Sequence, residues 1–199
     1  LGNSGKYDHV MEQLEIDWRF DNAMQAADNE IFVRTIVREV FRSNGLDVNF
    51  KAKPMIGLAG NGEHTHIGMA AVDSNGKIHN LFAAKNPREH FMSAIGFGAI
   101  MGILKNYEVI NPFVSATNDS LNRLKPGFEA PVCIVTSLGH TPMMPSRNRT
   151  ILAGLIRDLE SPMATRFELR ACNPYTNTYL ALAACYSAVL DGISKTIDH

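Results

Sequence analysis

The stretch KPMIGLAGNGEHTHIGMA, residues 53–70, carries the strongest local pattern in this 199-residue chain. A Lys-Pro pair opens it, a turn with three glycines follows, and a His-x-His pair comes directly after the turn. A little further on, Asn75-Gly76 separates two segments of strand character, and Asn-Gly is a strong hairpin signal. The pattern predicts a glycine-rich turn that leads into a hairpin with strands at 64–72 and 77–82.

The sequence on either side of this stretch mixes strand and helix patterns. Residues 13–20 alternate strictly between polar and apolar side chains, which predicts a half-buried strand. The other patterns predict short strands at 48–53 and 165–171, helices at about 22–43, 87–104 and 177–193 (the last ending at Gly192), and long loops over 111–145 around a strand at 131–135. The predicted fold class is α+β, with an antiparallel sheet and helices packed on one face.

Composition narrows the classes of function. The net charge is −1, so the basic footprint of a nucleic-acid-binding protein is missing. No run approaches the roughly 20 apolar residues of a membrane span, and no targeting signal opens the chain. The three cysteines are odd in number and stand in apolar surroundings, which predicts buried thiols and a cytoplasmic location. Because the chain starts at Leu1 and leads straight into a patterned strand, we expect it to be part of a longer polypeptide.

Three predicted strands carry groups that bind metals or phosphate on their polar faces. These groups are Glu15 on the first strand, His64 and His66 on the second, and Arg166, Glu168 and Arg170 on the third. Residues two apart on a strand point to the same side, so we expect these side chains to line one face of the sheet. Carboxylates with imidazoles suit Mg²⁺ or Mn²⁺, and arginines suit phosphate or carboxylate.

Each of these faces also has a simpler interpretation. A polar strand face is often only solvated, lone histidines are commonly surface or core residues, and an Arg-Glu-Arg row can be a structural ion pair. Three such faces in one short domain favour a metal- or phosphate-binding domain. The residues alone lead no further than that.

Several motifs resemble those of the glutamine synthetase family. The turn and His-x-His of residues 53–70 look like the family signature, and NRLKPGFEAP (122–131) resembles its flap. RNRT (147–150) is similar to its Arg-Asn-Arg loop, and residues 167–193 resemble its Glu-x-Arg strand, Asn-x-Tyr turn and last helix. EQLEIDWRFDNAMQAADN (12–29) resembles its Gln-x-Glu strand and helix. The matches follow the family order, so the resemblance implies the C-terminal part of a catalytic domain with a curved antiparallel sheet, spanning residues 1–199.

The resemblance implies a role for each matching residue. Glu15 and the shorter acid Asp8 would bind one metal ion, and His64 with Glu168 would bind another that bridges the ATP phosphates. Arg123, Arg170 and Gly60 would hold the amino-acid substrate, and His66, Arg149, Arg157 and Arg166 would contact the nucleotide or the transferred phosphoryl group. Glu129 would sit on the flap, where it shields the intermediate and accepts a proton from ammonium. Glu129 and Arg149 are thus the implied catalytic residues.

The implied activity is an ATP-dependent and Mg²⁺- or Mn²⁺-dependent ligase that makes glutamine from glutamate and ammonium through a γ-glutamyl phosphate. A closing loop would keep water from this acyl phosphate. The implied partners are these small molecules and further copies of the protein in a large homo-oligomer, with no nucleic acid and no membrane. The family's upstream Glu-x-Glu strand and its N-terminal β-grasp domain are not in these residues, so we expect the segment alone to bind metal weakly and to be inactive.

The sequence also departs from the family pattern. Ala59 stands where the family has an asparagine that helps to hold the substrate, unless Asn61 replaces it. Gly68 and Met163 stand where a serine and a lysine are expected, and residues 139–146 look like an insertion. Two alternatives therefore remain open: a γ-glutamyl ligase that acts on another amine or acid, and a scaffold of the same fold without catalysis.

Overall fold

The computed structural model describes residues 12–123 and 152–198. In chain order the helices are α1 (Ala23–Ser43), α2 (Ala94–Lys105), α3 (Tyr107–Val114), α4 (Asn118–Arg123) and α5 (Thr178–Ile197), with a 3₁₀ turn, η1 (Pro162–Ala164). The strands are β1 (Thr65–Ile67), β2 (Ala70–Val72), β3 (Ile78–Asn80), β4 (Ala153–Ile156) and β5 (Arg166–Leu169). The α+β prediction is confirmed.

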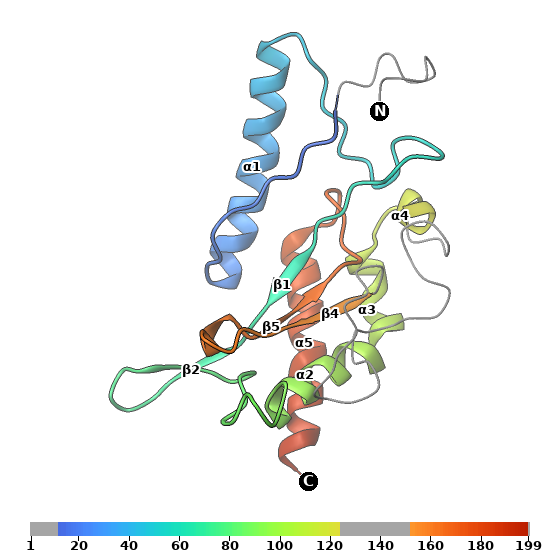
Figure 1. The fold of residues 1–199 in the computed structure, drawn as a ribbon. Coiled ribbons are helices and arrows are strands. Elements are labelled where there is room, and N and C mark those ends of the chain that lie inside the picture. Colours follow the sequence, from blue (N-terminus) through green and yellow to red (C-terminus); the bar gives the residue numbers. More distant parts are fainter. Residues whose placement is uncertain (1–11, 124–151, 199) are drawn as a thin grey trace.

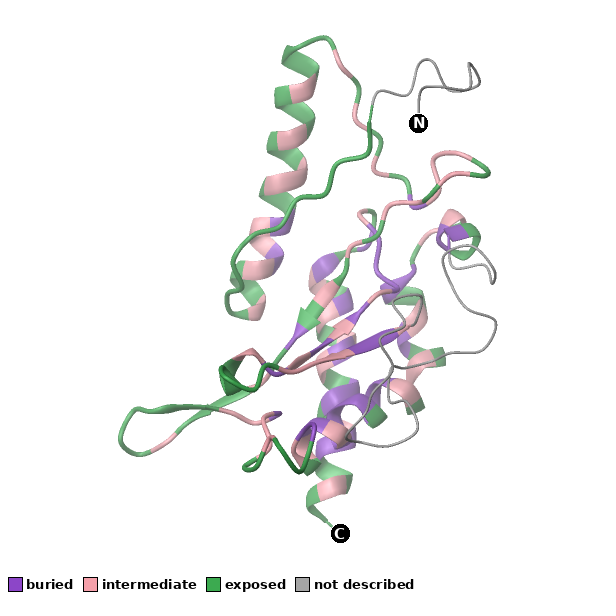
Figure 2. Ribbon diagram, in the orientation of Figure 1, coloured by how far each residue is buried: buried purple, intermediate pink, exposed green. Residues whose placement is uncertain are grey.

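The main sheet of the described residues has three antiparallel strands in the order β1-β5-β4. Its helices lie on one side, where Figure 1 shows α2, α3 and α5 behind the strands. Strand β5 follows the predicted alternation, because Phe167 and Leu169 are fully buried while Arg166 and Glu168 lie on the other face. The apolar face of the sheet and the helices behind it therefore form one core, drawn purple in Figure 2.

Helix α5 is the centre of that core. Asn177 caps its first turn, since its side chain accepts a hydrogen bond from the amide of Leu180 at 3.2 Å. Gly192 does not end the helix as predicted, because the helix continues to Ile197 and Gly192 packs against α2. A Cβ atom at Gly192 would lie 2.1 Å from the carbonyl oxygen of Gly98. Small residues at this crossing thus let the two helices approach backbone to backbone.

Within the described residues, α5 is also the one helix long and apolar enough to cross a membrane. Cys185, Ala188 and Val189 on this helix are buried in the core. One side of α5 packs on α2 and α3, while Leu180, Leu190 and Ile197 are exposed.

The predicted hairpin is confirmed for residues 70–72 and 78–80, which pair with each other. It is wrong for residues 65–67, which were predicted to belong to the same hairpin. β2 and β3 pair around a turn in which Gly76 has φ +79°, a conformation that favours glycine. β1, however, pairs with β5 instead, with His66 opposite Glu168. The chain passes from one sheet to the other at Gly68 and Met69, which places the two histidines beside the Arg-Glu-Arg strand.

The strand predicted at 13–20 is wrong. Residues 12–20 are exposed and form no ladder with any described strand, and Phe20 is 98% exposed. Alternation marks a surface suited to a sheet, but a strand exists only when a partner backbone supplies the hydrogen bonds. The strand predicted at 48–53 is also absent. In this segment the carbonyls of Asn49 and Lys51 accept hydrogen bonds from the side-chain amide of Asn61 in the glycine-rich turn.

Several boundaries also differ from the prediction. Helix α2 starts at Ala94 and not near residue 87, because Ser93 caps it by accepting a hydrogen bond from Gly96 at 2.9 Å. Residues 111–123 were predicted as loop, but they complete α3 and form α4. Strand β4 was not predicted, and the predicted strand 131–135 lies outside the described residues. Helix α1 matches its prediction.

Candidate active site

A charged group surrounds one carboxylate oxygen on the open face of the main sheet. We call it the Glu168 cluster, and its members are Glu168, His64, His66, Arg166 and Arg170. Oε1 of Glu168 lies 2.7 Å from Nη1 of Arg170, 3.1 Å from Nδ1 of His64 and 3.9 Å from Nε2 of His66. The structure thus confirms that the predicted groups of the second and third strands share one face.

The register of the sheet explains why these side chains meet. His66 on β1 and Gly154 on β4 flank Glu168 on β5. Gly154 is buried and has no side chain, so the cluster's side chains all come from the segments of β1 and β5. The cluster is therefore a product of strand pairing between segments about 100 residues apart in sequence.

The cluster favours an ionised carboxylate. Burial opposes the ionisation of Glu168, but the hydrogen bond from His64 and the charge of Arg170 outweigh it and lower the pKa of Glu168. Partial burial, followed by the positive charge of Arg166, lowers the pKa of His66. The site thus presents one anion, two arginines and a neutral His66 at neutral pH.

The donor atoms fit the chemistry of a divalent cation. Nδ1 of His64 and Oε1 of Glu168 lie 3.1 Å apart, so one divalent cation could bind both atoms. Within residues 12–123 and 152–198, no group of three histidine, cysteine or acidic side chains is close enough to enclose a metal ion. A complete ligand set would need donors beyond His64 and Glu168.

Glu15, the predicted ligand on the first strand, does not join this cluster. It is exposed, and no hydrogen bond or ion pair connects it to the cluster among the described residues. The acid of this segment whose charge acts on His66 is Asp17. Residues 12–20 pair with no described strand, so no sheet fixes the direction of the Glu15 side chain.

Arg123, the predicted substrate clamp, is buried beneath the cluster. Its guanidinium donates to the carbonyls of Arg170 at 3.0 Å and of Ala171 and Cys172 at 3.4 Å each. It therefore supports the backbone that follows β5. The glycine-rich turn wraps around this side chain, since a Cβ atom at Gly62 would lie 2.5 Å from Nη2 of Arg123.

Gly60 and Asn61, in the same glycine-rich turn, accept hydrogen bonds from Gln13. Gln13 donates to the carbonyl of Gly60 at 2.9 Å and to Oδ1 of Asn61 at 2.8 Å. A Cβ atom at Gly60 would lie 2.2 Å from the carbonyl oxygen of Ala52. Asn61 thus uses its side-chain amide to hold the turn together.

Arg157 is engaged by another part of the chain. Its Nη1 donates to the carbonyl of Pro87 at 2.7 Å, and its guanidinium lies 4.3 Å from the ring centre of Phe91. The structure does not bring it into the Glu168 cluster. Asp8, Glu129 and Arg149 lie outside the described residues, as does Cys133, whereas Cys172 and Cys185 are buried free thiols as predicted.

Sequence reasoning missed a second acidic group next to His64. Thr178 Oγ1 lies 3.1 Å from Oε2 of Glu30 and 3.3 Å from Oε1 of Glu63, and Glu30 pairs with Arg34 at 2.7 Å. Burial and the nearby charge of Glu30 raise the pKa of Glu63 to about 8. The Glu30-Arg34 spacing of four residues on a helix was the available signal.

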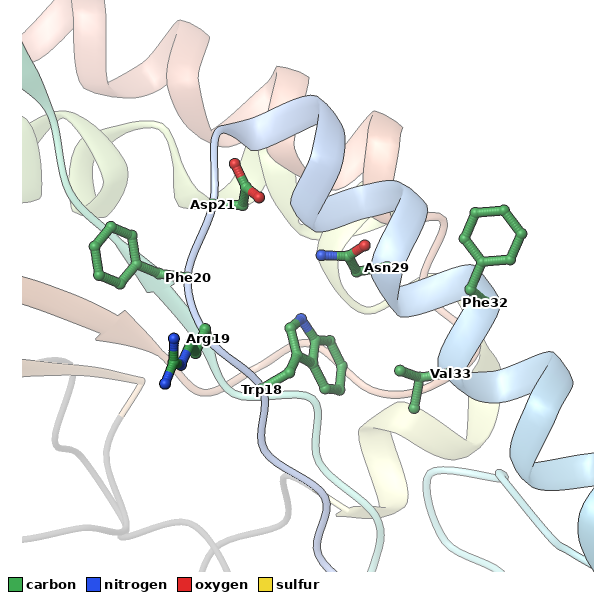
Figure 3. Close-up of a pocket in the computed structure, with 7 residues that line it drawn as sticks. All are labelled: Trp18, Arg19, Phe20, Asp21, Asn29, Phe32 and Val33. Carbon is green, nitrogen blue, oxygen red and sulfur yellow. The ribbon is translucent and has the colours of Figure 1, made fainter.

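A separate hollow lies between residues 18–21 and helix α1. Figure 3 shows Trp18 and Phe20 on the extended segment and Asn29, Phe32 and Val33 on the helix. It contains no member of the Glu168 cluster. Its apolar side chains come from the alternating segment that the described structure leaves unpaired.

Together, an open antiparallel sheet with helices on one face and a row of imidazole, carboxylate and guanidinium groups on the other define an α+β protein suited to anionic and cation-bound ligands. A family model for the glutamine synthetase catalytic domain matches residues 7–199. The chain therefore belongs to the glutamine synthetase catalytic-domain family.

Individual relatives agree with this assignment. Glutamine synthetase of Frankia alni is 34% identical over 194 residues, which cover 94% of this chain and 36% of that protein. The enzyme of Pyrococcus woesei is 37% identical over 186 residues, covering 94% of this chain and 38% of that protein. The chain thus spans little more than a third of the length of the curated relatives it matches.

Two solved structures share the fold. The glutamine synthetase of Plasmodium falciparum superposes with a TM-score of 0.75 at 28% identity, covering 89% of this chain and 32% of that chain. A structure of apo GmaS without ligand gives a TM-score of 0.71 at 29% identity, covering 90% of this chain and 37% of that chain. The predicted family and fold are confirmed.

Proposed function

We propose that this chain is the C-terminal part of the catalytic domain of an ATP- and divalent-metal-dependent ligase that forms glutamine from glutamate and ammonium. The observation that carries the proposal is the convergence of His64, His66 and Arg170 on one oxygen of Glu168. Family membership supports the ligase class. The proposed intermediate is a γ-glutamyl phosphate.

The residues of the cluster have distinct proposed tasks. Glu168 and Nδ1 of His64 would hold Mg²⁺ or Mn²⁺, which when bound neutralises phosphate charge. Nε2 of His66 would donate a hydrogen bond to a phosphate oxygen. Arg170 would bind a carboxylate of the substrate, because a guanidinium recognises a carboxylate with two parallel hydrogen bonds. Phosphoryl transfer mainly needs positioning and charge neutralisation, and these groups supply both.

Arg170 already has a partner, which gives it a second task. Its Nη1 donates to Oε1 of Glu168, and Arg123 holds its carbonyl from below. A residue whose main chain and guanidinium are both held loses little freedom when a substrate arrives. Pre-positioning of Arg170 by Glu168 and Arg123 would therefore favour binding of the acid substrate.

The remaining predicted residues keep their proposed roles. Glu15 and Asp8 would complete a metal site, Glu129 and Arg149 would act from the flap and the Arg-Asn-Arg loop, and Arg157 and Gly60 would line the nucleotide and substrate sites. The proposed setting is a cytoplasmic homo-oligomer. An N-terminal β-grasp domain would belong to the whole polypeptide.

The test is formation of glutamine by the whole native polypeptide, measured with glutamate, ammonium, ATP and Mg²⁺ or Mn²⁺. We expect phosphate release that depends on all three substrates and stops with a metal chelator. Glutamate-independent ATP hydrolysis, or no phosphate release with any acid, would contradict the proposal. The 199-residue chain is the control, and we expect it to be inactive.

A second candidate changes the amine or the acid but keeps the mechanism. It is favoured by the bonds of Asn61 to Asn49 and Lys51, which leave the position of Ala59 without a substrate-binding amide. The same assay with a series of alkylamines and polyamines separates the two. Activity with a larger amine and none with ammonium would favour this candidate.

A non-catalytic scaffold is the third possibility, and nucleotide binding tests it directly. Titration of the whole polypeptide with an ATP analogue and Mn²⁺ should release heat if the Glu168 cluster binds phosphate. Absence of binding would favour the scaffold.

A further inference from the structure

Asn80, the last residue of β3, connects the β2-β3 hairpin to the turn that precedes β5. Its Nδ2 donates to the carbonyls of Thr165 at 2.7 Å, Pro162 at 3.1 Å and Met163 at 3.2 Å. Its Oδ1 accepts a hydrogen bond from the amide of Phe82 at 2.9 Å. One side-chain amide therefore joins the end of the hairpin to η1 and to the residue that caps it.

These partners also fix which way the amide of Asn80 points. A backbone N–H only donates and a carbonyl only accepts, so Oδ1 faces Phe82 and Nδ2 faces the turn. Phe82 is fully buried and stacks on Phe167 of β5, with the ring centres 5.6 Å apart. The acceptor side of Asn80 is thus anchored on the core, and its donor side holds the turn.

The turn η1 has little else to hold it, because none of its three residues is buried. Backbone hydrogen bonds from Ala164 to Ser161 at 2.8 Å and from Thr165 to Pro162 at 3.1 Å close the turn on itself. A single 3₁₀ turn is weak when it stands alone. Its place relative to the sheet therefore depends on the hydrogen bonds that Asn80 supplies from β3.

Arg166, a member of the Glu168 cluster, depends on the same turn. It follows Thr165 directly, and its Nη1 donates to the carbonyl of Ala164 at 2.7 Å. Of the four carbonyls of residues 162–165, three accept from Asn80 and the fourth accepts from Arg166. A shift of the turn would move both the start of β5 and the acceptor of the guanidinium.

We propose that Asn80 is a positioning residue that acts through Arg166, because it fixes η1 and thereby the guanidinium that Arg166 presents to the nucleotide at the Glu168 cluster. The contact with the nucleotide rests on the proposed function, whereas the dependence of Arg166 on Asn80 does not. The carbonyls of the turn use both N–H bonds of the Asn80 amide, so Asn80 acts on the ligand only through its neighbours.

Two variants of Asn80 separate its hydrogen bonds from its size. Asn80→Ala removes the whole amide. Asn80→Asp keeps the size and the acceptor for Phe82, but it places a carboxylate without a proton to donate against three carbonyl oxygens. Asn75→Asp is the matched control, because it adds the same charge at an exposed position of the same hairpin.

The direct test is nuclear magnetic resonance on the ¹⁵N-labelled chain, in which the side-chain N–H groups of Asn80 and Arg166 are followed. In Asn80→Ala and Asn80→Asp we expect the Nε–H signal of Arg166 to shift and its proton to exchange with water about tenfold faster, since the turn is released. Asn75→Asp should leave this signal unchanged. An Arg166 signal that is the same in both Asn80 variants as in the unchanged chain would overturn the proposal.

The functional arm uses the affinity of the whole polypeptide for an ATP analogue with Mn²⁺. We expect Asn80→Asp to weaken nucleotide binding about tenfold and to leave the affinity for glutamate within about twofold, since only the nucleotide contact passes through Arg166. Asn80→Ala repeats the comparison without an added charge. In an Arg166→Ala background, Asn80→Asp should have no further effect.

Two results of these titrations would overturn the positioning role of Asn80. One is an equal loss of affinity for nucleotide and glutamate, which would mark a general effect on the fold. The other is a loss that multiplies with that of Arg166→Ala, because Asn80 would then act independently of Arg166. If the unchanged polypeptide binds no nucleotide, the proposed function fails, while the Arg166 signal still decides the role of Asn80.

Discussion

Nδ1 of His64 lies 3.1 Å from Oε1 of Glu168, although His64 precedes β1 and Glu168 lies on β5, about 100 positions further along the chain. This relationship exists because β1 leaves the hairpin and pairs with β5. It connects the glycine-rich turn to the Arg-Glu-Arg strand, and it is the basis of the first prediction.

Glu168→Gln should abolish Mn²⁺ binding by the cluster and weaken the fold. The amide cannot accept charge-assisted hydrogen bonds from both His64 and Arg170, and Arg170 would lose its anionic partner. We expect a loss of about 1–3 kcal/mol in the free energy of unfolding. In the whole polypeptide, ligase activity should fall on the order of 100-fold.

Urea unfolding and Mn²⁺ titration measure these two effects. Glu160→Gln is the control, because Glu160 is exposed and its side chain stands outside the cluster. Unchanged metal binding in Glu168→Gln would contradict the proposed ligand role.

Gly62→Ala should destabilise the turn that carries His64. The new Cβ atom would lie 2.5 Å from Nη2 of Arg123 and 3.0 Å from Nε2 of His64, so the buried guanidinium or the turn has to move. Overpacking of this kind costs about 1–3 kcal/mol. Thermal unfolding, monitored by circular dichroism, measures the change.

Gly68→Ala is the matched control for the turn. No atom lies within 4 Å of a Cβ placed at Gly68, which leads from β1 to β2. We expect a change within about 0.5 kcal/mol. Equal losses at both glycines would mean that chain flexibility, and not the contact with Arg123, determines the effect.

Glu63 should make the stability of the chain depend on pH. Its pKa is about 8 in the folded chain and near 4.5 when exposed, so the folded state binds an extra proton between these values. Because the folded state has more bound protons, the free energy of unfolding should fall as pH rises from about 5 to 8. Above pH 8 this contribution should be constant.

Glu63→Gln should remove that slope and stabilise the chain at pH 8, by an amount on the order of a few kcal/mol. Urea unfolding at several pH values measures it, with the exposed Glu89→Gln as control. A slope that survives in Glu63→Gln would assign it to another group. Oε2 of Glu63 is buried without a hydrogen-bond partner among the described residues, so the amide also avoids a buried charge.

Gly192→Ala should separate α5 from α2. Alanine favours a helix over glycine by about 1 kcal/mol, but its Cβ atom would lie 2.1 Å from the carbonyl of Gly98. We expect the clash to dominate and the chain to lose about 2 kcal/mol or more. Ser194→Ala, on the exposed side of the same helix, is the control. A stabilised Gly192→Ala variant would show that the helix crossing is looser than the structure has it.

Local patterns in the sequence predicted much of the sheet and the long helices. Phe167 and Leu169 alternate with Arg166 and Glu168, and this alternation alone placed the charged side chains on one face of β5. Helix α1 was predicted from the spacing of its apolar residues and from the Asn44-Gly45 stop. Such features depend on neighbours within a few residues, which the sequence displays directly.

Contacts between segments distant in the chain could not be predicted from the sequence. It could not show that the side-chain amide of Asn61 donates to the carbonyls of Asn49 and Lys51. Nor could it show that Arg123 donates to the carbonyl of Arg170. An exposed arginine and a buried one look alike in sequence. The prediction of a strand at 13–20 was wrong for the same reason, because pairing needs a partner backbone.

The sequence by itself determined the family and the antiparallel character of β5. It also showed the imidazole, carboxylate and guanidinium groups, in the order along the chain that the family has. Only the tertiary structure decided that β1 pairs with β5, that Glu168 is the shared acceptor and that Arg166 faces His66. The physical reason is that residue type sets which hydrogen bonds a side chain can make. Which of them it makes depends on the register between strands that lie about 100 residues apart.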